Sequence, residues 1–272
     1  MKRLIRSLLH SLGYDVIPYP INDWFEQKIT LGRHLMELFS RYQINCVLDV
    51  GAHYGEYGTF LREAGYTGKI ISFEPVKETF QRLQRLSVKD GNWDIHNFAL
   101  GAANTGMDIQ VFRDSELSSF LTPNDYCASH MGKTDLVAYT ERVEVRTLDS
   151  VFDSCVVGIA EPRVYLKLDT QGYDLTILEH ALGHLNQIQG LQSELSLKPI
   201  YEVMPSYLDA LPKLRELGFE VTGLFPVSRD RKLRLIEVDC VMIRERVPGQ
   251  EAPARVSSTG VLAAVEGGPE PK

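Results

Sequence analysis

The stretch VLDVGAHYGEYG (residues 47–58) decides the expected fold of this chain of 272 residues. A short apolar run with β-branched residues meets Asp49, then a glycine-rich turn, then a helical pattern that continues to Ala64. This order predicts a buried strand, a tight loop and a helix, the usual place for nucleotide-like ligands in open α/β sheets. Glycine lets the backbone approach a ligand closely, and the start of the helix offers free N–H groups.

Size and composition favour one large α/β domain with additions. Hydrophobic residues make up 44% of the chain and charged residues 24%, which is ordinary for a soluble globular protein with a full core. The net charge of −7 argues against nucleic acid as an electrostatic partner. No apolar run reaches the length of a membrane span, and the start of the chain lacks a convincing signal peptide. We therefore expect a cytoplasmic protein without an integral membrane span.

Cysteine spacing gives no sign of a metal site or a disulfide framework. The four cysteines are scattered, with no CxxC pair and no zinc-ligand spacing to a histidine: Cys46, Cys127, Cys155 and Cys240. We expect free thiols in a reducing compartment.

Two flanking segments differ from the middle of the chain. Residues 1–45 are predicted to be a helical segment, because apolar residues recur at helical spacing from Ile5 to Leu12 and from Trp24 to Phe39. We expect these helices to dock on the domain or on a second copy, as in a homo-oligomer, with contact to a membrane surface as the less favoured alternative. Residues 246–272 lack periodicity and are predicted to be a disordered tail.

Strands and helices alternate between these flanks. The expected strands are 46–50, 69–73, 93–99, 164–168, 191–197, 219–225 and 233–243. The expected helices are 55–65, a helix from Val76 onward, 174–185 and 205–217. Short connections favour an α/β fold with a Rossmann-like, doubly wound sheet, mostly parallel with an antiparallel last strand, behind an N-terminal helical prefix. Residues 102–160 interrupt this rhythm with two antiparallel-looking strands around a polar stretch, which is typical of a lid.

Glu74 ends the second expected strand, 23 residues past Gly51. An acid at this place suits hydrogen bonds to ribose hydroxyls in a doubly wound site. The alternative is an acid that caps the following helix. A dinucleotide fingerprint would need glycine where His53 stands, so the loop favours an adenosine ligand without pyrophosphate over NAD.

Several segments together resemble a known family. LDVGAHYGEYG (48–58) followed by SFEP (72–75) resembles the first two motifs of S-adenosylmethionine-dependent methyltransferases of the Rossmann-like class. NFALG (97–101), RTLD (146–149) and LKLDTQGYD (166–174) then follow in the order of the FkbM family of methyltransferases. The resemblance covers roughly residues 44–243. It implies a methyltransferase domain at 46–245, with 102–160 as its insertion or lid, and S-adenosyl-L-methionine as cofactor.

The resemblance also implies cofactor-binding residues. Gly51, Ala52 and Gly55 would line the methionine and ribose part of the cofactor, with Asp49 nearby, and Glu74 would hold the ribose hydroxyls. Phe98 and Ala99 would lie near the adenine, with Asn97 as a candidate polar contact. In that arrangement the backbone of the glycine loop comes close to the cofactor, one acid binds the ribose, and apolar residues form a slot for the adenine.

Two acids are the candidate catalytic residues. Asp169 ends the fourth expected parallel strand, where ligands gather, although it is also placed to cap a helix. Glu194 lies on the next strand and is expected to face the same crevice, with a structural salt bridge as the alternative. The pair would activate a substrate hydroxyl as general base. A divalent ion shared by both acids is the less favoured alternative, and we assign no metal ligand.

Other residues near the acceptor are weaker candidates. Ser118, Ser119 and Phe120 resemble a family segment near the acceptor, and His130 is a candidate base if the insertion closes over the site. One departure from the family stands at Gln171, since the family often has Glu, followed by Gly, two positions after the strand-end Asp. Gln171 supplies neutral hydrogen bonds only.

The resemblance implies a methyltransferase, which we expect to act on a hydroxyl of a sugar or secondary metabolite, so the partner is a small-molecule or glycan acceptor. Two other classes stay open. An NAD-dependent oxidoreductase is disfavoured by the missing glycine at position 53. A non-catalytic cofactor-binding module is favoured by Gln171 and disfavoured by the presence of Glu74 with Asp169.

Overall fold

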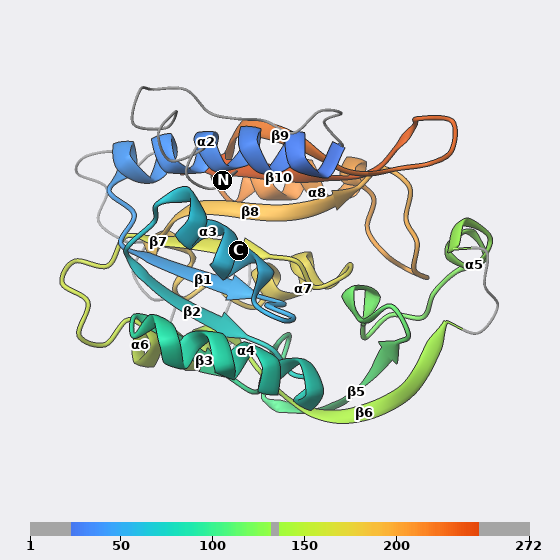
Figure 1. Cartoon of the computed structure of the whole chain (residues 1–272), viewed down its shortest axis with the longest axis horizontal. Coiled ribbons are helices and arrows are strands. Elements are labelled where there is room, and N and C mark those ends of the chain that lie inside the picture. Colours follow the sequence, from blue (N-terminus) through green and yellow to red (C-terminus); the bar gives the residue numbers. More distant parts are fainter. Residues whose placement is uncertain (1–22, 132–135, 245–272) are drawn as a thin grey trace, which may run out of the picture.

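A twisted sheet of seven strands runs through the computed structural model, which describes residues 23–131 and 136–244 (Figure 1). The strand order is β3-β2-β1-β7-β8-β10-β9. Neighbours from β3 to β8 are parallel, and β10 is antiparallel to both β8 and β9. The sequence-based expectation of a mostly parallel, doubly wound sheet with an antiparallel last strand is confirmed.

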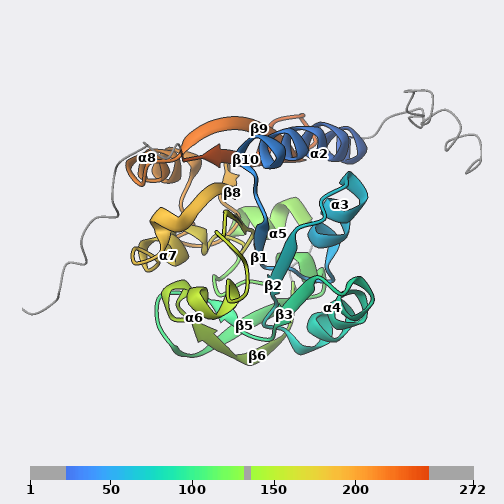
Figure 2. The same ribbon diagram turned by 90° about the vertical axis from the view of Figure 1, so that its left-hand side faces the viewer.

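Helices cover both faces of this sheet. Its strands are β1 (Cys46–Val50), β2 (Lys69–Phe73), β3 (Trp93–His96), β7 (Val164–Leu168), β8 (Ile188–Ser196), β9 (Glu220–Arg229) and β10 (Leu235–Ile243). The helices are α2 (Asp23–Tyr42), α3 (Glu56–Ala64), α4 (Lys77–Asp90), α6 (Leu148–Cys155), α7 (Asp174–Glu179) and α8 (Tyr207–Glu216). Figure 2 shows α2, α3 and α4 on one face and α6, α7 and α8 on the other.

Two apolar clusters fill the spaces between the sheet and its helices. Leu48 and Leu166 belong to the cluster under α6, α7 and α8, whereas Val47 and Tyr165 belong to the one under α2 and α3. All five residues of β1 and of β7 are buried, as expected for strands covered on both faces. The period of two along a strand places Asp49 and Lys167 on the α2 and α3 side, so this face holds two buried charges.

The helix expected between Trp24 and Phe39 is α2. Its side chains Leu31, Leu35, Leu38 and Phe39 are buried against the sheet and α3. The expected helix from Ile5 to Leu12 and the expected tail at 246–272 lie outside the described residues. No helix in the part of the chain that the structure describes is long and apolar enough to cross a bilayer. All four cysteines are buried and unpaired, as expected.

A smaller sheet begins just before the insertion at 102–160 and continues in it. Its strands β4 (Ala99–Leu100), β5 (Thr105–Phe112) and β6 (Val137–Arg146) have the order β4-β6-β5. The segments 107–112 and 142–145, expected to be antiparallel strands, lie in β5 and β6, which pair antiparallel with Met107 opposite Val143 and Phe112 opposite Val137. The insertion also contains a short 3₁₀ turn, η1 (Ser115–Leu117), and α5 (Asp125–Met131). In Figure 1, β5, β6 and α5 lie on the side toward which the arrows of β1 and β2 point.

Two predicted elements differ from the observed ones. The single strand expected at 93–99 ends at His96, and the chain enters the smaller sheet at Ala99, because the Asn97 side chain bonds back to the turn after β2. The helix expected at 174–185 ends at Glu179. Asp149 accepts hydrogen bonds from the backbone N–H groups of Gly183 and His184, which holds that segment in a turn.

Candidate functional site

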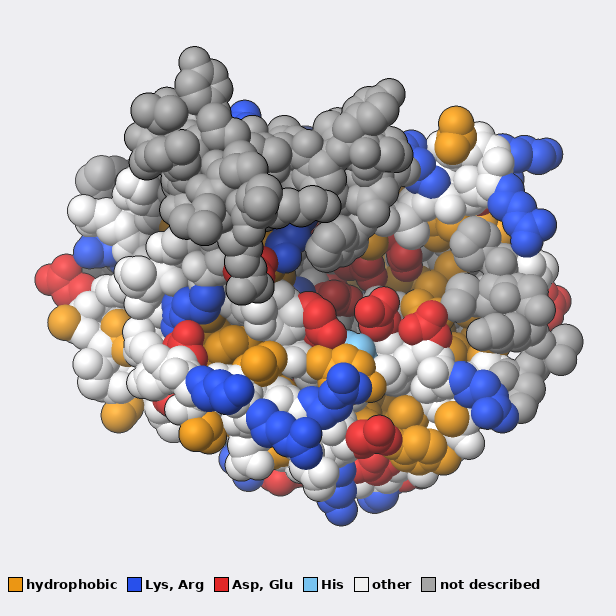
Figure 3. Space-filling model, viewed as in Figure 1, with side chains coloured by type: hydrophobic (Ala, Val, Ile, Leu, Met, Phe, Trp, Pro, Cys, Tyr) orange, Lys and Arg blue, Asp and Glu red, His pale blue; other side chains and the backbone are white. Residues whose placement is uncertain are grey.

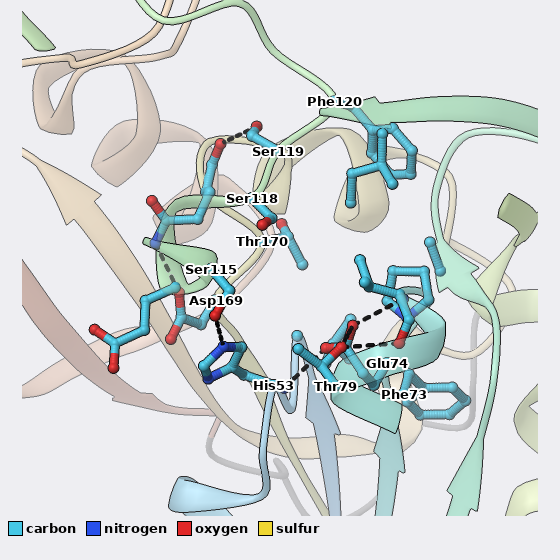
Figure 4. Close-up of a pocket in the computed structure, with 18 of the residues that line it drawn as sticks. His53, Phe73, Glu74, Thr79, Ser115, Ser118, Ser119, Phe120, Asp169 and Thr170 are labelled. Atoms are coloured by element: carbon cyan, nitrogen blue, oxygen red, sulfur yellow. Dashed lines mark hydrogen bonds between the residues drawn. The ribbon is translucent and has the colours of Figure 1, made fainter. Parts of the chain in front are cut away.

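A pocket lies at the carboxyl ends of β1, β2 and β7 under residues 115–120 of the insertion (Figure 4). The space within it, part of it open to solvent, is about 630 Å³. Parallel strands end at the same edge of a sheet, so the residues that follow them meet here. Among the described residues that line the pocket, every ionisable side chain other than His53 is an acid: Glu74, Glu116 and Asp169. Figure 3 shows acidic side chains gathered around a hollow near the middle of the molecule.

The structure brings only part of the predicted site into contact with this pocket. The predicted residues that line it are Gly51, Glu74, Ala99 and Asp169, together with the weaker candidates Ser118, Ser119 and Phe120. The predicted residues that do not line it are Asp49, Ala52, Gly55, Asn97, Phe98 and Glu194. The side chain of His130 lies outside the described part of the chain.

Glu74 follows β2 and is only 5% exposed. Its Oε1 accepts hydrogen bonds from the Thr79 hydroxyl (2.7 Å) and the Val76 backbone N–H (2.8 Å), and its Oε2 accepts one from the His53 backbone N–H (2.9 Å). Burial raises the pKa of Glu74 to about 7, although these donors oppose the rise. A carboxylate has roughly four acceptor positions, so about one remains for a ligand hydroxyl. Glu74 therefore caps the start of α4 and lines the pocket at the same time.

Protein packing explains the loop glycines. Gly51 has a φ of +76°, and a Cβ there would lie 2.0 Å from the carbonyl oxygen of Asp169, so glycine lets the ends of β1 and β7 come together. Gly55 has a φ of +92°, and a Cβ there would lie 2.9 Å from the Leu83 side chain. Ala52 is buried in the cluster beneath α2 and α3. Of these three loop residues, only Gly51 borders the pocket.

Asn97 and Phe98 support the pocket from outside it. The Asn97 side-chain amide donates to the carbonyl oxygens of Glu74 (2.9 Å) and Pro75 (3.0 Å), which fixes the turn that carries the acid. Phe98 packs against Phe73, with 5.6 Å between ring centroids. The pocket wall beside them is apolar and consists of Phe73, Val76, Ala99, Leu100 and Ile109.

Asp49 lies beneath the pocket and is fully buried. Its Oδ2 accepts a hydrogen bond from the Ser72 hydroxyl (2.9 Å), which in turn accepts one from the Trp93 indole N–H (2.9 Å). Its Oδ1 lies 3.2 Å from the Lys167 ammonium. Buried charges persist only when they are paired and hydrogen-bonded, and Asp49 is both.

Lys167 connects the loop to the acid of the next strand. Its side chain is 6% exposed, and its Nζ donates to the Gly51 carbonyl oxygen (3.2 Å) and lies 3.4 Å from Asp169 Oδ2. Burial by itself lowers the pKa of Lys167, but the carboxylates of Asp169 and Asp49 outweigh it and raise this pKa above its ordinary value. The ammonium therefore stays charged between two carboxylates.

Asp169 lies in the pocket with its side chain 39% exposed. Its Oδ2 faces Lys167, and its Oδ1 accepts a hydrogen bond from the Gln171 side-chain amide (3.1 Å). Asp169 does not cap α7, whose N-cap residue is Tyr173. Asp174 Oδ1 accepts bonds from the backbone N–H (3.0 Å) and the hydroxyl (2.5 Å) of Thr170, which holds the turn between Asp169 and α7. Asp169 is therefore available to a ligand.

Glu194 lies behind Asp169 on β8. Its Oε2 accepts a hydrogen bond from the same Gln171 amide (3.0 Å), so the two candidate acids lie on either side of one amide nitrogen. Burial raises the pKa of Glu194 well above its ordinary value, and the nearby Glu237 and Asp169 carboxylates raise it further. Among the described residues, no group of three or more His, Cys, Asp or Glu side chains is arranged to hold a metal ion.

His53 joins the loop to the insertion above the pocket. Its Nε2 lies 2.7 Å from the Ser115 hydroxyl, and both side chains point toward each other in Figure 4. The Tyr54 hydroxyl lies 3.2 Å from the same Ser115 oxygen. With a φ of +49°, His53 adopts a left-handed backbone that is uncommon outside glycine.

Sequence reasoning missed the roles of two residues at this site: Lys167 and Ser115. Lys167 had a usable signal, because it is a lone lysine within an otherwise apolar strand. Ser115 had none, since its role depends on a contact with His53 across 62 residues of chain.

Comparison with known proteins places the chain among methyltransferases. Residues 49–221, more than half of the chain, match the family described as methyltransferase FkbM domain. No curated protein matches the chain.

Solved structures show weaker similarity. Magnesium protoporphyrin IX methyltransferase from Synechocystis, with bound S-adenosylmethionine, is 11% identical over 90% of this chain and 97% of that chain, with a TM-score of 0.41. Fibrillarin from Aeropyrum pernix, with natively bound S-adenosyl-L-methionine, is 10% identical over 73% of this chain and 66% of that one, with a TM-score of 0.41. Ribosomal protein L11 methylase from Lactobacillus delbrueckii is 11% identical over 83% of this chain and 81% of that one, with a TM-score of 0.40. Similarities this weak carry no information about the substrate.

Proposed function

Because this chain belongs to the FkbM family of methyltransferases, we propose that its pocket binds S-adenosyl-L-methionine and that it methylates a hydroxyl group of a sugar or secondary metabolite. One observation carries the proposal. Glu74 and Asp169 line opposite parts of a single pocket, so an acid suited to ribose and an acid suited to a reacting hydroxyl share one cavity (Figure 4).

The cofactor half of the pocket fits an adenosyl group. Glu74 has about one acceptor position left for a ribose hydroxyl, and the apolar wall beside it offers a slot for a flat ring. Glu74, Ala99 and the backbone at Gly51 would hold the cofactor there. When bound, S-adenosylmethionine supplies a methyl group activated by its sulfonium.

The acceptor half supports proton removal by Asp169. This side chain is partly exposed to the pocket and is held on both oxygens, by Lys167 and by Gln171. Glu194 is the poorer base of the two acids, because its raised pKa keeps it protonated to higher pH and it does not line the pocket. Asp169 would accept the proton of the acceptor hydroxyl while the surrounding residues orient that hydroxyl.

The roof of the pocket suits a hydroxyl-rich acceptor. Ser115, Ser118 and Ser119 contribute hydroxyl groups, Phe120 contributes an aromatic face, and Thr170 after β7 adds a further hydroxyl group to the pocket. Sugars combine polar edges with apolar ring faces, so this mixture matches their chemistry. We extend the proposal to the insertion at 102–160, which would act as the lid of a methyltransferase domain at 46–245.

Calorimetry on the full chain tests the cofactor. We expect binding of S-adenosylmethionine and S-adenosylhomocysteine and none of NAD. Absence of binding by the first two to folded protein would refute the proposal, and binding of NAD alone would replace it with an oxidoreductase. A mass-spectrometric screen of candidate acceptors for the gain of a methyl group then tests the acceptor. A methyl gain on nitrogen or carbon would contradict the hydroxyl assignment.

A further inference from the structure

We propose that Gln171 is a positioning residue that joins Asp169 and Glu194 into one hydrogen-bonded unit and ties this unit to the roof of the pocket. The inference rests on the proposed function for the role of Asp169. It goes beyond that function because it assigns a task to a neutral residue that stands where the family often has an acid.

The first step is the geometry of the amide. Gln171 Nε2 lies 3.1 Å from Asp169 Oδ1 and 3.0 Å from Glu194 Oε2. A side-chain amide carries two N–H hydrogens, so each carboxyl group receives one. Asp169 follows β7 and Glu194 lies on β8, so this single nitrogen links the ends of two neighbouring strands.

The second step is the orientation of the amide. Gln171 Oε1 lies 3.0 Å from the hydroxyl of Tyr201, a fully buried side chain whose single hydroxyl hydrogen is shared with the Leu117 carbonyl oxygen at 2.7 Å. The Gln171 carbonyl oxygen accepts a hydrogen bond from the Ser119 hydroxyl at 2.9 Å. At the other end of the amide lie oxygens of two carboxyl groups, which accept hydrogen bonds when ionised, so the nitrogen faces the acids. Leu117 and Ser119 belong to the insertion, so the roof holds the amide in place.

The third step is the backbone. Gln171 has a φ of +53° and is 9% exposed, so a residue with a long side chain is held in the left-handed region in the protein interior. That conformation is uncommon for residues other than glycine and persists where tertiary contacts determine it. The left-handed backbone and the hydrogen bonds at both ends of the side-chain amide together hold Gln171 between the two acids and the roof.

The fourth step is the electrostatic effect. Two carboxyl groups that share a neighbourhood repel one another when ionised, so one of them is driven to keep its proton. Donors aimed at both groups favour their ionised forms. Lys167 supports Oδ2 of Asp169 and Gln171 supports Oδ1, so both oxygens of the candidate base are oriented. A carboxylate at position 171 would add a third negative charge in place of two donors.

An infrared pH titration of the full chain tests this bridge without cofactor or acceptor. A protonated carboxyl group gives its own infrared band. The band that disappears in Glu194→Gln belongs to Glu194, and the band that disappears in Asp169→Asn belongs to Asp169. We expect the apparent pKa of the pair to rise by about one unit or more in Gln171→Met, which removes both donors, and by more in Gln171→Glu, which keeps the shape but adds charge.

Gln192→Met is the matched control. Gln192 is also a buried glutamine on the same face of the sheet, but its Oε1 accepts from the hydroxyls of Tyr57 (2.8 Å) and Tyr165 (3.3 Å) instead of bridging acids. We expect no change in the carboxyl titration for this variant. A shift in Gln171→Glu without one in Gln171→Met would overturn the bridge, because charge alone would then explain it. A shift of equal size in Gln192→Met would overturn it as well.

Turnover gives the second readout, on whichever acceptor gains a methyl group in the screen. We expect kcat to fall by about tenfold or more in Gln171→Met at neutral pH and to recover partly at higher pH, with S-adenosylmethionine affinity within about threefold of wild type. Equal losses at every pH would indicate a purely structural role and would overturn the inference. Failure of the wild-type chain to bind S-adenosylmethionine would refute the proposed function instead, while the titration would still decide on the bridge.

Discussion

Glu74 and Asp169 line the same pocket although the strand β1 lies between β2 and β7, the strands that they follow. The loop after β1 fills the space between the two acids. Its residue His53 donates to Glu74 through the backbone, and Gly51 packs against the carbonyl oxygen of Asp169. One short loop therefore positions both acids. Substitutions of Glu74 and of Asp169 should nevertheless have separate effects, on cofactor affinity and on turnover.

Replacing Glu74 by Ala should weaken S-adenosylmethionine binding by roughly 10- to 100-fold. The reason is the loss of a hydrogen bond from a ribose hydroxyl to a charged acceptor, worth about 1.5–3 kcal/mol. Calorimetry measures this affinity. Glu78→Ala is the control, since Glu78 is an exposed acid on the same helix start and should leave the affinity unchanged. Wild-type affinity in Glu74→Ala would refute the ribose assignment.

The free energy of unfolding should depend on Glu74 between pH 4.5 and 7. Burial raises the pKa of Glu74 from 4.5 to about 7, so the folded state binds more protons than the unfolded state in this window. Stability therefore falls as pH rises through it, by about 3 kcal/mol in total. Glu74→Gln should remove that loss. Denaturant unfolding of both proteins at pH 5 and pH 8 checks the difference, and parallel pH dependence in the two proteins would contradict the prediction.

Replacing Lys167 by Met should destabilise the chain by about 3–5 kcal/mol, because two buried or half-buried carboxylates lose their shared cation. Urea unfolding measures this change. Lys69→Met provides the comparison, since Lys69 pairs with the exposed Asp94 and should cost about 0–1 kcal/mol. Similar costs for both lysines would show that the buried pair contributes no more than a surface pair.

Replacing Asp169 by Asn should lower turnover by roughly 100-fold or more while S-adenosylmethionine affinity stays within about threefold. Asparagine keeps the size of the side chain but cannot accept the proton of the acceptor hydroxyl. Kinetics on the methylated acceptor and calorimetry on the cofactor separate the two effects. Asp108→Asn, on an exposed salt bridge of β5, should leave both values unchanged. A matched loss of cofactor affinity in Asp169→Asn would place Asp169 at the cofactor instead.

Chelators should leave turnover unchanged. The nitrogen of Gln171 lies between Asp169 and Glu194 and aims hydrogen atoms at both, so it occupies the place where a shared divalent ion would be bound. Turnover with and without EDTA, followed by addition of Mg²⁺, measures this. Loss of activity in EDTA with recovery in Mg²⁺ would restore the metal alternative.

The order of elements and the positions of the two acids follow from local patterns. Buried strands such as 46–50 and 164–168 are short apolar runs, and each is followed by polar residues at the edge where parallel strands end. Glu74 and Asp169 were predictable because each stands directly after such a run. The apolar period of α2 was predictable for the same reason.

Long-range contacts account for the rest. The strand expected at 93–99 breaks because Asn97 bonds to a turn more than 20 residues earlier, and the helix expected at 174–185 stops where Asp149 holds its continuation. The bridge at Gln171 exists only when β7, β8 and the insertion meet. Apolar periodicity depends only on residues that are close together in the sequence, so it can be recognised in a single sequence. Which buried polar groups satisfy one another depends on how distant segments pack, because a desolvated amide or carboxyl group must find its partner wherever the fold has placed one.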